Sequence, residues 1–346
     1  MKKISIGLWV FFFTTIIWSQ KKSPNIILMI GDGMGLTQIS SGMYANDNST
    51  ALEKFDYIGL SKTASFDKLI TDSAASGTAM ATGIKTNNKV LGISPDNIHQ
   101  KSILEICKEK GYKTALIATS SIVHATPASF YAKENSRYNY ENIALQLRNH
   151  NIDIIVGGGS KYFTTRKDKR NLINEMSEYE FVKSVDELEK SISTKIGYFT
   201  YFGEPPSILN GRPANLDLIT KTIINKLSLN KSPFIVVIEG SQIDWGGHDN
   251  DSKMVLSEFI DFDSAIKEAL EFAKNDGNTL VVVTADHETG GMSLNGGEIN
   301  NVNIKFNTKS HTGTMVPVFS FGPSSETFSG IYENTQIFYK LRESIK

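Results

Sequence analysis

Three compact groups of polar residues have the composition of a metal centre. Asp244 and His248 stand four residues apart, close enough for a carboxylate and an imidazole to share one ion. Asp286-His287 directly follows an apolar run, and His311 precedes another. Zinc accepts both carboxylate oxygen and imidazole nitrogen as ligands. Singly, each group could be a turn, a helix cap or a hydrogen-bonded histidine. Together they indicate metal binding, because buried strand ends rarely carry carboxylates unless these are paired or bound to a metal.

A second candidate for chemistry is the small-residue stretch 71–83, which reads TDSAASGTAMATG. Ala and Met favour helix, and Asp or Ser is a preferred N-cap, so this stretch predicts a tightly packed helix that begins at Asp72-Ser73. Backbone N–H groups and the positive end of the helix dipole would then face Ser73 Oγ. Such a place favours an alkoxide and attracts an anion such as phosphate. The alternative is a capped core helix without chemistry.

The elements that would position these residues alternate between apolar runs and helical patterns. We expect strands at 25–30, 113–119, 152–156, 196–202, 233–239, 280–285 and 316–321. We expect helices at 72–83, 102–110, 139–150, 215–229, 253–275 and 334–344, with charged helical segments in 166–193. This alternation predicts an α/β fold, a mainly parallel central sheet with helices on both faces.

In such sheets ligands bind beyond the carboxyl ends of the strands. Unusual polar residues follow four of the predicted strands there: Asp32, then His124 and Thr126, then Glu239 and Asp244, and finally Asp286-His287. Metal-type ligands at four strand ends therefore indicate one shared metal-binding site.

Composition narrows the class of protein. The net charge of −1 and the lack of basic clusters argue against nucleic acid or an anionic membrane surface as partner. The single cysteine, Cys107, allows no intrachain disulfide and no thiolate metal cluster, and we expect it to be buried and inert. The remaining histidines, His99 and His150, stand in polar surface contexts without an acidic partner nearby.

The N-terminus is typical of a secretory signal. Lys2-Lys3 precede the apolar run 4–18, which is shorter than the ~20 residues that a membrane span needs, although a lone anchor is the alternative. We therefore predict a signal peptide at 1–20 and a mature chain, 21–346, that folds as a single domain in the periplasm or outside the cell. No comparable apolar run follows, so we expect no membrane association after signal removal.

Six short motifs, in order along nearly the whole mature chain, resemble those of the alkaline phosphatases. They are 30–35 (IGDGMG), 71–79 (TDSAASGTA), 124–128 (HATPA), 239–244 (EGSQID) with His248, 284–287 (TADH) and 311–313 (HTG). Six ordered motifs make a specific match. The resemblance implies hydrolysis of small phosphate monoesters to an alcohol and inorganic phosphate, two zinc ions, one magnesium ion and a homodimer.

Carried over position by position, the resemblance also implies roles for the site residues. The first zinc would be held by Asp244, His248 and His311. The second would be held by Asp32, Asp286 and His287, beside Ser73 as the nucleophile that forms a phosphoserine. Magnesium would be held by Glu239, Thr126 and a second oxygen of Asp32, with His124 meeting it through water. Arg137 falls where the family binds phosphate, and we expect Asp72 to cap the helix and position Arg137.

Two positions depart from the best-known bacterial members. His124 stands where these have Asp, as it also does in animal enzymes and some cold-active marine bacterial ones, and Trp245 stands where these have Lys. A neutral histidine weakens the negative field on the magnesium. Tryptophan cannot hydrogen-bond phosphate as lysine does.

Other functions have weaker support. A phosphodiesterase of the same superfamily shares the zinc ligands but typically lacks the magnesium set, so Glu239 and Thr126 favour the monoesterase. A sulfatase would need a Ser/Cys-x-Pro-x-Arg context, which Ser73 lacks. A dinucleotide-binding module is disfavoured because 31–35 has the spacing G-x-G-x-G and an Asp that would repel a pyrophosphate.

Overall fold

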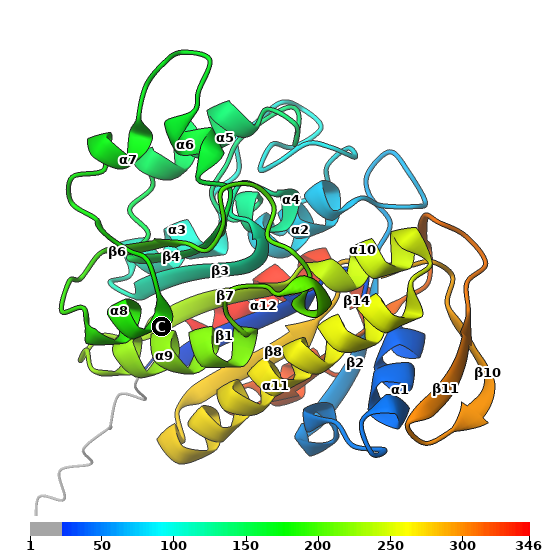
Figure 1. Cartoon of the computed structure of the whole chain (residues 1–346). Coiled ribbons are helices and arrows are strands. Elements are labelled where there is room, and N and C mark those ends of the chain that lie inside the picture. The colour runs from blue at the N-terminus through cyan, green and yellow to red at the C-terminus, as the bar shows by residue number, and fades with distance from the viewer. Residues whose placement is uncertain (1–22) are drawn as a thin grey trace, which may run out of the picture.

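A ten-stranded sheet forms the centre of the molecule in a computed structural model that describes residues 23–346 (Figure 1). The strand order is β14-β2-β13-β8-β1-β7-β3-β4-β6-β5, and only β13 runs antiparallel to its neighbours. The strands are β1 (Asn25–Gly31), β2 (Tyr57–Lys62), β3 (Lys113–Ser121), β4 (Ile154–Gly158), β5 (Glu180–Val182), β6 (Ile196–Phe199), β7 (Phe234–Gly240), β8 (Thr279–Thr284), β13 (Val316–Phe321) and β14 (Gly330–Glu333). The predicted signal peptide, 1–20, lies outside the described residues.

Helices cover both faces of this sheet, so the predicted α/β architecture with a mainly parallel sheet is confirmed (Figure 1). One face packs against α2 (Ser73–Thr82), α3 (Ile103–Glu109), α4 (Ala125–Ala128), α5 (Tyr140–Asn149) and α12 (Thr335–Ser344). The other face packs against α1 (Leu36–Ala45), α8 (Val185–Lys190), α9 (Leu216–Ser228), α10 (Gln242–Asp249) and α11 (Ser252–Asp276).

Strand β1 shows why its sequence is apolar without interruption. Ile26, Leu28 and Ile30 point into the first of the two cores. Ile27 and Met29 point into the second, and all five side chains are fully buried. A central parallel strand that is covered on both faces has no solvent side, so it has no polar alternation.

Most predicted elements are confirmed to within two or three residues, with exceptions at the edges of the fold. The segment 166–193 is helical only in part: α7 (Leu172–Glu175) and α8 are short, and β5 lies between them. The sequence prediction missed α1, β2 and β14, and also the hairpin of β10 (Ser293–Glu298) and β11 (Asn301–Lys305), which packs beside α1 (Figure 1).

Two predictions about single residues have different outcomes. Cys107 is buried, as predicted, and burial raises the pKa of its thiol, which makes it a poor nucleophile. The prediction for His150 was wrong. Its ring is half-buried, packs edge-on against Tyr131 at 5.9 Å and interacts with Glu105, while burial lowers its pKa.

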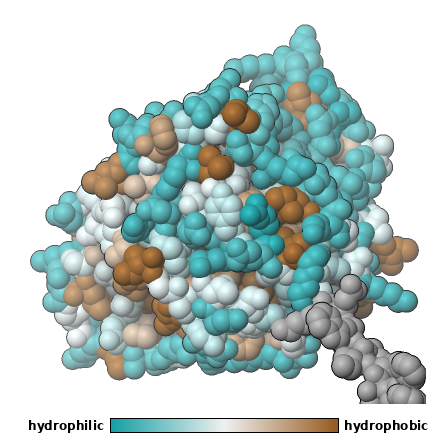
Figure 2. All heavy atoms as spheres, turned by 180° about the vertical axis from the view of Figure 1, so that it is seen from behind, coloured by the Kyte–Doolittle hydropathy of each residue, from teal (hydrophilic) through white to brown (hydrophobic). Residues whose placement is uncertain are grey.

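Figure 2 shows the described residues on the side opposite to that of Figure 1. Apolar side chains form small separate groups there, surrounded by polar ones (Figure 2). Among residues 23–346, no helix combines the length and the apolar character that crossing a bilayer requires.

Candidate active site

The candidate site lies where four neighbouring strands, β8, β1, β7 and β3, end at the same edge of the sheet. Asp32 directly follows β1, and Glu239 is the penultimate residue of β7. Asp286 and His287 follow β8, and His124 follows β3 at the start of α4. Parallel strands bring their carboxyl ends together, so the topology gathers residues that are far apart in the sequence.

Asp244, His248 and His311 form the first cluster with metal-binding geometry. Asp244 Oδ2 lies 3.4 Å from His248 Nε2, one turn further along α10, and Asp244 Oδ1 lies 3.4 Å from His311 Nε2. The Nδ1 atoms of His248 and His311 donate to the carbonyls of Lys309 and Thr71, at 2.6 and 2.9 Å. Their Nε2 atoms therefore lie 3.1 Å apart and both face Asp244, an arrangement that a shared cation would suit.

The charge of Asp244 fits this cluster. Burial alone would raise its pKa, but the hydrogen bond with His311 and the neighbouring imidazoles of His287, His311 and His248 lower it below the usual range. Asp244 is therefore an ionised carboxylate in the buried site, which is the form that binds a metal.

Asp32, Asp244 and His287 form a second cluster. His287 Nε2 lies 3.5 Å from Asp32 Oδ1 and 3.1 Å from Asp286 Oδ2. Asp286 Oδ1 accepts from the backbone N–H groups of Gly33 and His287, at 3.1 and 2.9 Å, which fixes the carboxylate and leaves Oδ2 toward the centre. Burial, with Asp286 and Asp244 close by, raises the pKa of Asp32 well above its usual range.

The third cluster consists of Asp32, His124 and Glu239. Thr126 Oγ1 donates to Asp32 Oδ2 over 3.4 Å, so all four residues of the predicted magnesium site lie together. Burial raises the pKa of Glu239 to about 7 despite hydrogen bonds from Ser241 and Thr126. Burial and the neighbouring Arg137 lower the pKa of His124 to about 3, so its imidazole is neutral.

An independent observation indicates that these carboxylates and imidazoles suit divalent cations. Among residues 23–346, Asp32 Oδ1, Glu239 Oε1 and Asp286 Oδ2 are buried atoms without a hydrogen-bond partner. His287 Nε2 lies within ion-pair distance of the two aspartate oxygens, but a single imidazole cannot satisfy three buried carboxylate oxygens, so the site calls for further positive charge.

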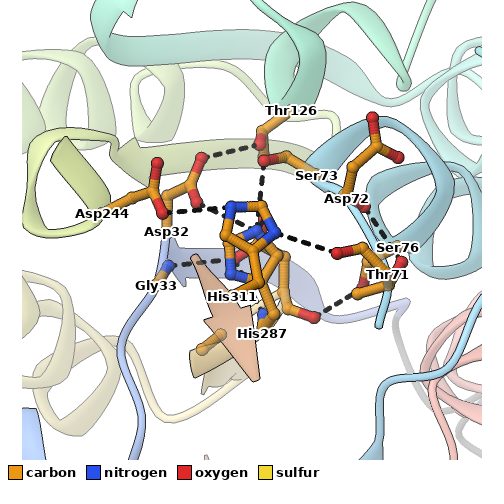
Figure 3. Close-up of polar contacts among 12 residues, drawn as sticks. Asp32, Gly33, Thr71, Asp72, Ser73, Ser76, Thr126, Asp244, His287 and His311 are labelled. Carbon is orange, nitrogen blue, oxygen red and sulfur yellow. Dashed lines mark hydrogen bonds and ion pairs between the residues drawn. The ribbon is translucent and has the colours of Figure 1, made fainter. Parts of the chain in front are cut away.

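Ser73 is the first residue of α2 and faces these clusters (Figure 3). Its Oγ lies 3.3 Å from His287 Nε2. Asp72 caps the helix by accepting from Ala75 N–H at 3.0 Å. The other hydroxyls of the helix bond elsewhere: Ser76 Oγ donates to the Asp286 carbonyl at 2.8 Å, and Thr82 Oγ1 to the Thr78 carbonyl at 2.7 Å.

Small residues let α2 pack this closely. All ten residues of the helix are buried, and a Cβ added to Gly77 would lie 2.4 Å from Ser129 Oγ. Larger side chains would push α2 away from α4 and from the sheet edge. The small residues of α2 therefore allow the close packing that places Ser73 at the edge of the sheet.

Arg137 reaches the site from the loop before α5. Its Nη1 donates to Asp72 Oδ2 over 3.1 Å, and Nη2 lies 3.5 Å from His124 Nε2. The loop is tied back because Arg137 N–H donates to the Lys89 carbonyl at 2.8 Å, while Lys89 N–H donates to both oxygens of Asp72 at 3.1 Å. Trp245, on α10, packs edge-on against His124 with ring centroids 6.0 Å apart.

The sequence analysis missed residues that hold the ligands in place. Ser120 and Ser241 donate to Glu239 Oε2, at 3.2 and 2.5 Å. Thr289 Oγ1 donates to Asp244 Oδ1 at 2.5 Å. Serine and threonine are common everywhere, and only proximity in the fold distinguishes these; for Thr289, a place two residues after Asp286-His287 was the one available signal.

Comparisons with known proteins agree with this geometry. The family model described as alkaline phosphatase matches residues 23–304. Alkaline phosphatase 3 of Bacillus subtilis is 36% identical, over 95% of this chain and 91% of the relative. The solved alkaline phosphatase of the Antarctic bacterium TAB5 is 41% identical, with a TM-score of 0.89 over 94% of this chain and 98% of that one.

A variant of the TAB5 enzyme, in which a histidine is replaced by glutamate, was solved with Mg bound in its M3 site. This variant is 42% identical to the chain, with a TM-score of 0.88 over 94% of this chain and 99% of that one. The family match covers most of the chain, and the similarity to the first two relatives extends over nearly all of both chains. On this sequence and fold similarity, the chain belongs to the alkaline phosphatase family.

Proposed function

We propose that this alkaline phosphatase hydrolyses phosphate monoesters through a phosphoserine at Ser73. The observation that carries the proposal is the place of Ser73 Oγ, at the N-terminus of α2 and 3.3 Å from His287 Nε2, beside three clusters of metal-type ligands. Among the described residues, this is the place where a buried hydroxyl meets a helix N-terminus and so many carboxylates and imidazoles.

Two zinc ions and one magnesium ion would complete the site. The first zinc would be held by Asp244, His248 and His311, the second by Asp32, Asp286 and His287 beside Ser73, and magnesium by Asp32, Thr126 and Glu239 with His124 nearby. When bound, such ions lower the pKa of coordinated oxygens and neutralise charge on a transferring phosphoryl group. The buried carboxylate oxygens without hydrogen bonds and the facing Nε2 atoms of His248 and His311 support this assignment.

The protein side chains then have separate tasks. Ser73 Oγ loses its proton and bonds to phosphorus while the P–O bond to the alcohol breaks, and the leaving alcohol takes up a proton. Water then attacks the same phosphorus, breaks the bond to Ser73 Oγ and releases inorganic phosphate and the free Ser73 hydroxyl. The N–H groups at the start of α2 stabilise negative charge at this point. The Arg137 guanidinium offers two N–H groups to the equatorial phosphate oxygens, and Asp72 holds it in orientation.

The test is phosphate release together with metal analysis, on wild type and Ser73→Ala. A phosphoserine mechanism predicts that Ser73→Ala keeps its metals and loses nearly all turnover. Rapid quenching of wild type with labelled substrate at acid pH should trap label on a peptide that contains Ser73. Turnover of Ser73→Ala close to that of wild type would refute the proposal.

A phosphodiesterase of the same superfamily is the second candidate. The third cluster, Asp32, His124 and Glu239 with Thr126 beside it, favours the monoesterase, because the ion it would hold adds positive charge, which a doubly charged monoester needs more than a singly charged diester does. Comparing kcat/KM for p-nitrophenyl phosphate and its bis ester separates the two. A preference for the bis ester would overturn the assignment.

We also infer that the mature chain is a single domain that is exported and forms a homodimer. One continuous ten-stranded sheet with a core on each face supports a single domain. Export rests on the signal-like segment 1–20 and the dimer on family resemblance. Light scattering of the purified mature chain tests the dimer, and N-terminal sequencing of protein from the periplasm or medium tests cleavage.

A further inference from the structure

A fully buried threonine contacts ligand residues of both predicted zinc sites. Thr289, in β9 (Glu288–Thr289), places Oγ1 2.5 Å from Asp244 Oδ1 and 3.2 Å from His287 Nδ1. Asp244 lies in the cluster with His248 and His311 and also in the one with Asp32 and His287, whereas only His287 of these two residues faces Ser73. One hydroxyl therefore contacts a ligand of each predicted zinc site.

The number of protons available decides the direction of these hydrogen bonds. A threonine hydroxyl has one proton and can also accept, whereas an ionised carboxylate only accepts. The Thr289 proton therefore goes to Asp244, and Thr289 Oγ1 accepts from the Nδ1–H of His287. In its neutral form, which is the form that binds a metal, His287 then carries its lone pair on Nε2, the nitrogen that lies 3.3 Å from Ser73 Oγ. A single hydroxyl thus orients the carboxylate and selects the tautomer of the imidazole.

The surroundings of Thr289 hold the hydroxyl in this place. A Cβ on Gly33, whose φ is +73°, would lie 2.8 Å from Thr289 Oγ1, and a Cβ on Gly247 would lie 2.9 Å from Thr289 Cγ2. Thr289 N–H donates to the Gly33 carbonyl at 3.3 Å, and β9 pairs with β12 (His311–Thr312), so that Thr289 lies opposite His311. Glycines at both neighbouring positions leave room for this one side chain.

We propose that Thr289 is a positioning residue that couples the two zinc sites, by fixing the Asp244 carboxylate and the His287 tautomer together. The proposal rests on the assignment of these residues as zinc ligands under the proposed function. Partners that orient metal ligands commonly contribute about 10–100-fold in metal affinity. Removal of the hydroxyl should therefore weaken both sites at once, although Thr289 binds no metal itself.

The experiment compares Thr289→Val, which keeps the shape and loses the hydroxyl, with Thr289→Ser, which keeps the hydroxyl. The control is Thr220→Val in α9, another fully buried threonine, whose Oγ1 has no partner among residues 23–346. Metal-free protein is titrated with Co²⁺, and the visible absorption of the bound ion reports affinity and ligand geometry at each site. Thr289→Ala against Thr289→Ser repeats the comparison if the valine variant does not fold.

We expect Thr289→Val to bind cobalt about 10–100-fold more weakly, with a changed absorption spectrum, while Thr289→Ser stays within about threefold of wild type. If Thr289→Val titrates like wild type, or if Thr289→Ser loses as much as Thr289→Val, the coupling role is wrong and the metal sites still stand. If wild type and Thr220→Val bind no cobalt, the proposed function itself fails.

Discussion

Arg137 Nη1 donates to Asp72 Oδ2 over 3.1 Å, so the carboxylate that caps α2 also holds the Arg137 guanidinium. Both side chains are largely buried, with 11% and 16% of their surface exposed, so solvent does not screen the pair as it would at the surface. Burial alone would lower the pKa of Arg137, but Asp72 more than offsets this and raises it. One acidic residue thereby places both the first turn of α2 and the Arg137 guanidinium, the two parts to which the proposed function gives catalytic roles.

The first prediction concerns Asp72→Asn. The asparagine oxygen can still accept from Ala75 N–H, so the helix cap should survive with a loss of at most about 1 kcal/mol in unfolding free energy. The charge that orients Arg137 is removed, so we expect KM and the inhibition constant for phosphate to rise about tenfold. Steady-state kinetics with phosphate as inhibitor measures this. Unchanged phosphate inhibition would show that Arg137 does not depend on Asp72.

A second prediction concerns magnesium and His124. A neutral imidazole gives the third cluster less negative charge than a carboxylate would, so we expect dialysed enzyme to regain activity when Mg²⁺ is added. His124→Glu should bind Mg²⁺ at least about tenfold more tightly, because it adds a charged oxygen ligand. Calorimetric titration of Zn²⁺-loaded protein gives the affinity, and His99→Glu, at an exposed position, is the control for added charge. Equal activity with and without Mg²⁺ in the metal-stripped, Zn²⁺-loaded wild type would contradict the first part.

The third prediction is a pH dependence of metal uptake. In the metal-free protein the pKa of Glu239 is raised to about 7, so its carboxyl keeps a proton below that pH and loses it above. Metal binding needs the ionised form, so it should release close to one proton from Glu239 at pH 6 and close to none at pH 8.5. Calorimetry in buffers of different ionisation enthalpy counts the protons. Glu239→Gln is the control, and the difference between the two proteins should disappear at high pH.

A fourth prediction concerns stability far from the site. Arg212 pairs with Glu258 at 2.8 Å and with Asp261 at 2.6 Å, and all three residues are buried. Arg212→Leu leaves two carboxylates without a partner in the interior and should cost about 3–5 kcal/mol of unfolding free energy. Urea denaturation measures the loss. Lys101→Met, which breaks the exposed pair with Glu109, is the matched control and should cost less than about 1 kcal/mol.

Through its contact with Asp261, Arg212 also affects how the free energy of unfolding varies with pH. Burial raises the pKa of Asp261 to about 6, although Arg212 opposes this. A raised carboxyl pKa means that the folded state holds the proton more tightly than the unfolded state does. The Asp261 contribution to stability therefore falls as pH rises from about 4 to 6, and the fall should be steeper in Arg212→Leu, which lacks the opposing charge.

The sequence predicted those parts of the fold that a local pattern marks, such as an uninterrupted apolar run or a spacing of one helical turn. β1 is apolar because both its faces are buried, and Asp244 and His248 lie in one cluster of metal-type ligands because one helical turn separates them. Helix α1 lacks such a signal, since Gln38 and Ser41 are among its buried residues. Gln38 is buried because it donates to Glu288 Oε1 at 2.8 Å, a partner 250 positions away that no local pattern reveals.

The residues of the candidate site differ in the same way in how far the sequence reveals them. Residues at strand ends could be predicted, because the parallel topology fixes where strand ends meet. Residues whose role comes from a contact across the fold could not, as Thr289 and Asp244 illustrate at a separation of 45 positions. Arg137 lies between these cases: no spacing indicated it, and resemblance alone pointed to this arginine.

The last prediction concerns product release and Trp245. The indole packs edge-on against His124 at 6.0 Å and offers one N–H donor and no charge. Trp245→Lys adds an ammonium group beside the phosphate site, where it can hold product, so the inhibition constant for phosphate should fall about tenfold. If product release limits turnover, kcat should fall with it, while kcat/KM changes less. Trp245→Met, which removes the ring without adding charge, separates electrostatics from packing. Equal phosphate inhibition in the lysine and methionine variants would show that loss of the ring, and not the added charge, controls release.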